Sequence, residues 1–394
     1  MKRNTISFFF LIVLIFVCAF QTSAWGISGE IYDELRYLII GLVTVSFLSS
    51  YKGNILRHTK IPVFKAHFWG LVIFSFILIL LYFLGLDPEW QPARDLWIAL
   101  ILLIIGLDIN LSKRRFIKLI NIYIIAYTVA ALSIVFVFSS GFNIREIYLP
   151  VPKNQIAPSF GAAFILALYL GIKSSAFKRY GYFIFSGLLL ASLLVLRGRS
   201  VMVGTFFSIL LLVFCFIRSR RYKIVAFLIG FFLVLFIGQF IYESFFLNYD
   251  VDSINSFSAH RYDVYLMAFS FLKTNFIFGL LGGAKFTDYT IHNYVLYNLV
   301  NYGILISFVL FLIYIKYIGT LFKGIRLNKF EYSEIGLLPM VIIFVVSFFE
   351  YTYPYAPGSS IFFTFFLLGQ YLRANYIVIH SDVTIQTEAL PKPF

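Results

Sequence analysis

Long runs of apolar residues, separated by short polar joints, repeat along nearly the whole chain. Each run approaches the roughly 20 residues that a helix needs to cross the hydrocarbon core of a membrane. The pattern predicts twelve such helices, at 6–24, 35–50, 67–85, 94–109, 116–138, 158–173, 181–196, 200–217, 222–241, 292–316, 334–350 and 357–372. The predicted fold is therefore all-α: a transmembrane bundle of about twelve spans that forms one domain, 1–394.

Composition and charge support this fold class. Of the 394 residues, 61% are hydrophobic and 13% are charged, which is more apolar side chain than a soluble core of this size can bury. The net charge of +14 is unevenly distributed: with Met1 in the cytoplasm, the inner joints carry 23 of the 32 Lys and Arg residues. Cytoplasmic loops of membrane proteins are enriched in Lys and Arg, so this distribution of charge indicates which ends of the helices face the cytoplasm. We therefore expect no nucleic-acid partner.

The first apolar run has two interpretations. Lys2-Arg3, a short apolar stretch and Thr22-Ser23-Ala24 also describe a cleavable signal peptide. We favour an uncleaved first helix, since a chain with eleven further spans needs no separate export signal. Either interpretation leaves Trp25 on the outer side.

The longest outer segment, 242–291, is predicted to hold a helix on the membrane surface. From Ala259 the spacing becomes helical, and one face would carry Tyr262, Tyr265, Leu266, Phe269 and Leu272. Such an amphipathic helix suits the outer surface of the membrane, and it should end at about Asn275. Gly279, Gly282 and Gly283 follow, and glycines permit tight backbone geometry near a ligand or another helix.

Two histidines, one within this loop and one directly after it, are candidates for proton transfer. His292 opens the next predicted helix, and a neutral imidazole can accept a proton near neutral pH. The structural alternative is a histidine that merely begins a helix. His260 is the second candidate for the same role.

Several cations are expected on the same outer side. Arg197-Gly198-Arg199 joins two helices at the hydrocarbon boundary, where arginines are costly unless they reach water or bind a partner. Guanidinium groups match phosphate oxygens, so an anion site is the functional interpretation and interfacial snorkelling is the structural one. Lys153-Asn154-Gln155 offers a cation and two amides to a phosphate or a sugar, or is simply part of a loop with several prolines.

A tyrosine-rich joint completes the outer candidates. Clustered tyrosines at 351–355 are typical of an interfacial belt, and they can also stack on sugar rings. Glu350 would then accept hydrogen bonds from sugar hydroxyls. We expect no metal site, because Asp288 and His292 lack a convincing third ligand.

The order of these motifs resembles the O-antigen polymerase and O-antigen ligase superfamily of bacterial envelopes. The resemblance covers roughly 153–312: Lys153-Asn154-Gln155 before a helix, Arg197-Gly198-Arg199 between two helices, Arg261 in a large outer loop and His292-Asn293 opening the next helix. It implies a GT-C-like bundle in the inner membrane. The implied activity is that of a metal-independent, inverting glycosyltransferase without a cofactor, which acts at the periplasmic face on oligosaccharides linked to undecaprenyl pyrophosphate.

The resemblance also implies roles for individual residues. His292 and Arg261 would be catalytic, and the pyrophosphate or sugar would be bound by Arg197, Arg199, Lys153, Asn154, Asn293 and His260. The implied partners are the lipid-linked oligosaccharide, membrane lipid, a chain-length regulator and a flippase.

Three functions remain open. We favour a polymerase, because the motifs Lys153-Asn154-Gln155 and Arg197-Gly198-Arg199-Ser200 look more like those of polymerases than like those of ligases. A ligase, which transfers glycan to a lipid A core, shares the same arrangement. A flippase or secondary transporter is a further alternative, although it should place ionisable groups near the membrane midplane.

Overall fold

The computed structural model describes residues 2–28, 31–138, 153–196, 198–216, 261–281, 286, 290–327, 333–355 and 359–388. These residues form helices and no strand. The helices are α1 (Lys2–Gln21), α2 (Ala24–Ser28), α3 (Tyr32–Ser50), η1 (Ile55–Lys60), α4 (Pro62–Phe83), α5 (Gln91–Asp108), α6 (Lys113–Phe138), α7 (Lys153–Lys173), α8 (Ala176–Leu196), α9 (Arg199–Phe216), α12 (Arg261–Asn275), α13 (Tyr294–Leu327), α14 (Ser333–Val346) and α15 (Ser359–Glu388).

Each predicted apolar range overlaps a helix in the described part of the chain, although the range 292–316 is interrupted at Gly303; the range 222–241 lies outside the described residues. Among the described residues, six segments are long and apolar enough to cross a membrane: Asn4–Gln21, Pro62–Phe83, Lys113–Val137, Asn154–Lys173, Phe177–Leu196 and Tyr294–Gly324. The all-α, membrane-type class is therefore confirmed.

Helix α7 is the central helix of the bundle. Of its apolar window 83% is buried, against 28% for α8, and it packs against α6, α8, α9, α14 and α15. Small side chains permit this enclosure: a Cβ on Gly161 would lie 3.0 Å from the side chains of Val201 and Thr205 in α9. Close approach at small residues is the usual way in which membrane helices associate. The start of α7 is therefore held on a rigid element.

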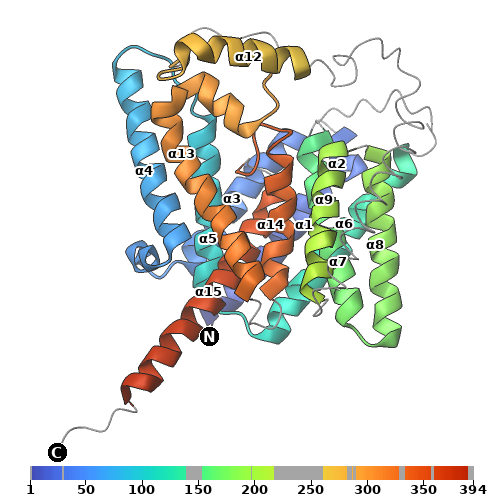
Figure 1. The fold of residues 1–394 in the computed structure, drawn as a ribbon. Coiled ribbons are helices and arrows are strands. Elements are labelled where there is room, and N and C mark those ends of the chain that lie inside the picture. The colour runs from blue at the N-terminus through green and yellow to red at the C-terminus, as the bar shows by residue number, and fades with distance from the viewer. Residues whose placement is uncertain are drawn as a thin grey trace, which may run out of the picture.

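Helix α12 lies across one end of the bundle, whereas the N-terminus and the far end of α15 lie at the opposite end (Figure 1). We call the first of these the α12 end. The helix ends at Asn275, as predicted. Its predicted single apolar face is wrong: Val264, Ala268 and Leu272 are buried, but Tyr262, Leu266 and Phe269 are exposed. Apolar side chains therefore lie on two sides of the helix, and packing against the bundle buries the side that carries Val264 and Ala268.

Helix α13 is two helices joined at Gly303. This glycine has φ 63° and ψ 178°, which only glycine adopts readily. The ring of Tyr294 stacks on that of Tyr314 at 5.4 Å, and Ser307 Oγ donates to the carbonyl of Asn298 at 2.7 Å. The first part, 294–302, therefore runs back alongside the second, 304–327. The predicted continuous helix 292–316 is wrong here, and Tyr294 lies roughly 15 Å along the helix axis from the turn.

The turn after α12 forms backbone hydrogen bonds with α13 at its break. Leu280 N–H donates to the carbonyl of Val300 at 2.9 Å, and Ile304 N–H donates to that of Phe276 at 2.8 Å. These bonds satisfy backbone groups that the break removes from the helical ladder. Gly279 also has a positive φ, 62°, and its hypothetical Cβ would lie 2.4 Å from the nitrogen of Gly303. The expectation that Gly279 permits a close approach to another helix is confirmed.

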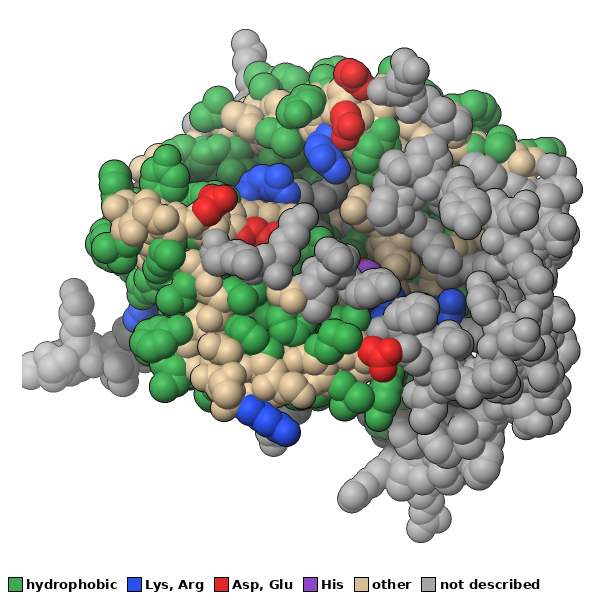
Figure 2. Space-filling view, turned by 90° about the horizontal axis from the view of Figure 1, so that it is seen from above, with side chains coloured by type: hydrophobic (Ala, Val, Ile, Leu, Met, Phe, Trp, Pro, Cys, Tyr) green, Lys and Arg blue, Asp and Glu red, His purple; other side chains and the backbone are tan. Residues whose placement is uncertain are grey.

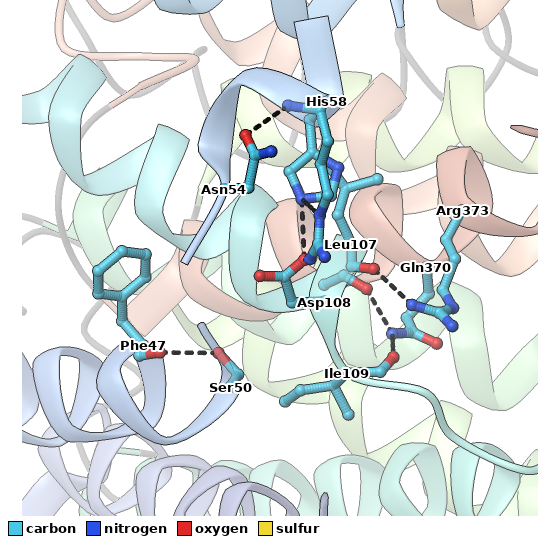
Figure 3. A network of polar contacts seen from close by, with 11 residues as sticks. Phe47, Ser50, Asn54, His58, Leu107, Asp108, Ile109, Gln370 and Arg373 are labelled. Carbon is cyan, nitrogen blue, oxygen red and sulfur yellow. Dashed lines mark hydrogen bonds and ion pairs between the residues drawn. The ribbon is translucent and has the colours of Figure 1, made fainter. Parts of the chain in front are cut away.

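A polar network fixes the opposite end of the bundle (Figure 3). Asp108, 1% exposed, is paired with Arg57 and with His58, whose Nε2 lies 2.8 Å from Oδ1. Arg373 Nη1 donates to the carbonyl of Leu107 at 2.7 Å, and Gln370 Nε2 donates to that of Ile109 at 2.8 Å. The last carbonyls of α5 are thus capped by α15.

Candidate functional site

Glu350, in the turn between α14 and α15, joins three residues that are far apart in sequence. Its Oε1 accepts hydrogen bonds from Arg261 Nη2 at 3.1 Å and from the Asn154 side-chain amide at 2.5 Å. Its Oε2 lies 3.2 Å from His292 Nδ1. The carboxylate is 9% exposed, whereas the Arg261 and His292 side chains are 27% and 35% exposed. The carboxylate is thus enclosed, whereas its two basic partners are partly exposed.

The start of α7 is shaped by a proline. Pro158 has no N–H, so the carbonyl of Asn154, four residues earlier, loses its helical partner. The hydroxyl of Tyr353 donates to that carbonyl at 3.2 Å. This bond ties the 351–355 turn to α7, and it brings Glu350 within reach of the Asn154 side chain.

His292 is held by the residues that follow it. Asn293 caps the first part of α13, because its Oδ1 accepts from the N–H of Leu296 at 2.9 Å. Its Nδ2 donates to the carbonyl of Phe348 at 3.2 Å, and Tyr294 N–H donates to that of Ser347 at 2.9 Å. Asn293 was predicted to bind substrate, and this stays a prediction. The structure also gives it a place in the fold: it caps the helix and holds the turn that carries Glu350.

Tyr265 links α12 to His292. Its hydroxyl donates to the carbonyl of His292 at 2.8 Å, one helical turn from Arg261. Burial raises the pKa of Tyr265 above its ordinary value, so the phenol remains a donor at neutral pH. Arg261 and His292, which the sequence predicts to act together, are therefore connected both through Glu350 and through Tyr265.

Of the other predicted basic residues, the structure describes only some. Gly198 packs on the start of α7, where its hypothetical Cβ would lie 2.9 Å from the Cβ of Ala157. The joint that carries Arg199 therefore lies within about one helical turn of Asn154 along α7, and Arg199 itself is exposed. Lys153 begins α7, but its side chain lies outside the described residues. Arg197 and His260 also lie outside them.

The α12 end of the molecule carries charges of both signs. Seen from this end, Lys, Arg, Asp and Glu side chains are scattered over the described part of the face, and a histidine side chain is visible close to a basic one (Figure 2). Glu350 lies near the N-terminal ends of α7 and α13, where the helix dipole favours a negative group. Three donors thus compensate one enclosed carboxylate, and the imidazole beside it is oriented.

Glu350 is the residue that sequence reasoning undervalued. Its position before the tyrosine run suggested a ligand for sugar hydroxyls, but its contacts are 58, 89 and 196 residues away in sequence. No local spacing could reveal them. The available signal was an acidic residue at the end of an apolar helix, a place where a carboxylate requires a partner.

Comparison of the chain with models of known protein families and with curated proteins returned no match.

Proposed function

We propose that this protein is a polysaccharide polymerase of the bacterial inner membrane. It would transfer a growing glycan from undecaprenyl pyrophosphate to the next lipid-linked repeat unit at the periplasmic face. The observation that carries the proposal is the contact of Glu350 with both His292 and Arg261 at one end of an apolar bundle. In this proposal the chain has twelve spans, and the α12 end is periplasmic.

His292 is the proposed general base. When Nδ1–H donates to Glu350, the lone pair of Nε2 is left to accept a proton. The acceptor hydroxyl would lose its proton to Nε2 while its oxygen forms a bond to the anomeric carbon. The bond between that carbon and the pyrophosphate oxygen breaks, and its electron pair leaves with the pyrophosphate. Attack from the opposite face inverts the configuration, and no metal is required.

Arg261 is proposed to stabilise the leaving group. One nitrogen, Nη2, contacts Glu350, and a guanidinium has further N–H groups that can bind phosphate oxygens. Negative charge grows on the pyrophosphate as the glycosidic bond breaks, so a fixed cation favours the transition state over the ground state. Arg199, Arg197 and Lys153 are proposed to bind the same anion.

Glu350 is proposed as a positioning residue. A bare carboxylate would repel a pyrophosphate, but this one accepts hydrogen bonds from Arg261 and Asn154 and pairs with His292. Its charge is therefore largely offset, and its two oxygens fix the directions of the base and the cation.

Deletion of the gene tests the proposed function. Surface polysaccharide from the deletion strain and from the complemented strain would be compared on a gel. A single repeat unit on the lipid A core in place of a ladder supports a polymerase. Polymer that remains on the lipid carrier would instead identify a ligase, and loss of all outward glycan would identify a flippase.

A further inference from the structure

A recess beside the candidate site has not been assigned a role. It lies where α5 begins, where the first part of α13 begins and where the 351–355 turn passes between them. The recess is lined by Gln91, Pro92, Asp95, Tyr294, Tyr297, Asn298, Tyr351, Thr352 and Tyr355. Its walls continue directly from the site, since Tyr351 follows Glu350 and Tyr294 comes two residues after His292.

The size of the recess limits what can enter it. Its cavity volume is about 20 Å³, which is room for one group the size of a water molecule and far less than a site needs to enclose a whole small molecule. One small polar group can therefore be enclosed while the rest of a ligand stands in the mouth.

Two residues of the lining each carry a buried polar atom without a partner in the described part of the protein: Asn298 Oδ1 and the hydroxyl of Tyr355. The two residues are 1% and 2% exposed. Asn298 Nδ2 donates to the carbonyl of Tyr294 at 2.7 Å, which fixes the amide and leaves Oδ1 as an acceptor. Buried polar atoms without partners are unfavourable, so two of them around one recess indicate a missing group.

The chemistry of the walls defines that group. Asn298 Oδ1 can only accept a hydrogen bond, and the Tyr355 hydroxyl has a proton to donate. The carboxylate of Asp95, 3% exposed and 3.2 Å from Arg94 Nε, disfavours an anion in the recess. A cation cannot accept a hydrogen bond from the Tyr355 hydroxyl. A neutral hydroxyl can donate to Asn298 and accept from Tyr355 at the same time.

We propose that this recess binds one neutral hydroxyl group, and that a sugar residue of the glycan substrate supplies it. The second part of the proposal rests on the proposed function; a bound water is the other source of the same chemistry. The rings of Tyr297 and Tyr351, with centroids 4.4 Å apart, form an aromatic wall at the recess. Aromatic faces of this kind suit the C–H face of a neutral sugar ring. The recess would therefore select among sugars by the position of a hydroxyl.

The test is Tyr355→Phe, which removes only the unpartnered hydroxyl. The purified full-length protein would be studied in a His292→Ala background, so that binding is measured without turnover. The probe is the lipid-linked glycan extracted from the deletion strain. We expect the affinity for this probe to fall about fivefold, as for the loss of one neutral hydrogen bond, with an unchanged Tm.

The matched control is Tyr317→Phe. This hydroxyl is also buried, but it pairs with His67 Nδ1 at 2.6 Å and lies outside the recess. We expect the control to lower Tm and to leave the affinity unchanged. If Tyr355→Phe instead lowers Tm and leaves affinity unchanged, the hydroxyl belongs to a water and the sugar assignment is overturned. No change in either quantity would overturn the site altogether. Failure of the probe to bind even the parent protein would instead refute the proposed function.

Discussion

Nδ1 of His292 lies 3.2 Å from Oε2 of Glu350, and the other oxygen of that carboxylate is held by Arg261 and Asn154. In the proposed mechanism, the carboxylate fixes the tautomer and the ring orientation of the imidazole and stabilises the positive charge that the imidazole gains with a proton.

Glu350→Gln should lower glycan polymerisation about 100-fold, because the neutral amide no longer stabilises the imidazolium that forms as His292 takes a proton. The protein should still accumulate, since Gln keeps the size of the side chain and one acceptor oxygen for Arg261 and Asn154. Ladder formation in cells and kcat in membranes would measure the effect. Glu34→Gln, the same change at an exposed position, serves as the control. Wild-type ladders from Glu350→Gln would remove Glu350 from the mechanism.

His292→Ala should abolish chain extension while the protein still inserts and accumulates. The side chain is 35% exposed, so its removal creates no buried cavity of the kind that unfolds proteins. The carbonyl that Tyr265 contacts is backbone and survives the substitution. Immunoblotting of membranes would report accumulation, and gels of surface glycan would report activity. A normal ladder would exclude His292 as the base.

Arg261→Lys should lose most activity although it keeps the positive charge. A lysine ammonium can still pair with Glu350, but it cannot also present a planar fork of N–H groups to phosphate oxygens. We expect a loss of about tenfold or more in kcat with the lipid-linked donor, and Arg261→Ala should abolish extension. Full activity in the lysine variant would show that charge alone suffices at this position.

Gly303→Ala should destabilise the protein by about 3 kcal/mol, because its φ of 63° and ψ of 178° suit only glycine. The new Cβ would also lie 2.2 Å from the carbonyl oxygen of Ile277, a backbone atom that cannot move aside alone. Gly319→Ala is the matched control in the same helix, where nothing lies within 4 Å of the added Cβ. Thermal unfolding of the detergent-solubilised protein compares them; equal Tm values would refute the strained turn.

The sequence predicted the helices well because length and hydropathy are local properties. The end of α12 at Asn275 and the close approach at Gly279 also came from local signals. The reversal of α13 could not be predicted from local signals. The apolar run continues on both sides of Gly303, and hydropathy does not show whether the chain goes straight on or turns back. The candidate residues could be listed from the sequence, but their meeting at Glu350 depends on contacts between distant segments. The capping role of Asn293 could have been recognised, since an Asn immediately before an apolar helical run is an ordinary N-cap signal.

Tyr353→Phe should destabilise the start of α7 by about 1 kcal/mol, because the carbonyl of Asn154 then loses the hydroxyl that replaces its missing helical partner. Pro158→Ala supplies an N–H to that carbonyl and offers a direct test of this explanation. In the Pro158→Ala background, Tyr353→Phe should lower Tm clearly less than in the wild type. Because Asn154 also contacts Glu350, the single variant should lose activity that the double variant partly regains. Equal Tm losses in the two backgrounds would show that Tyr353 acts through a different contact.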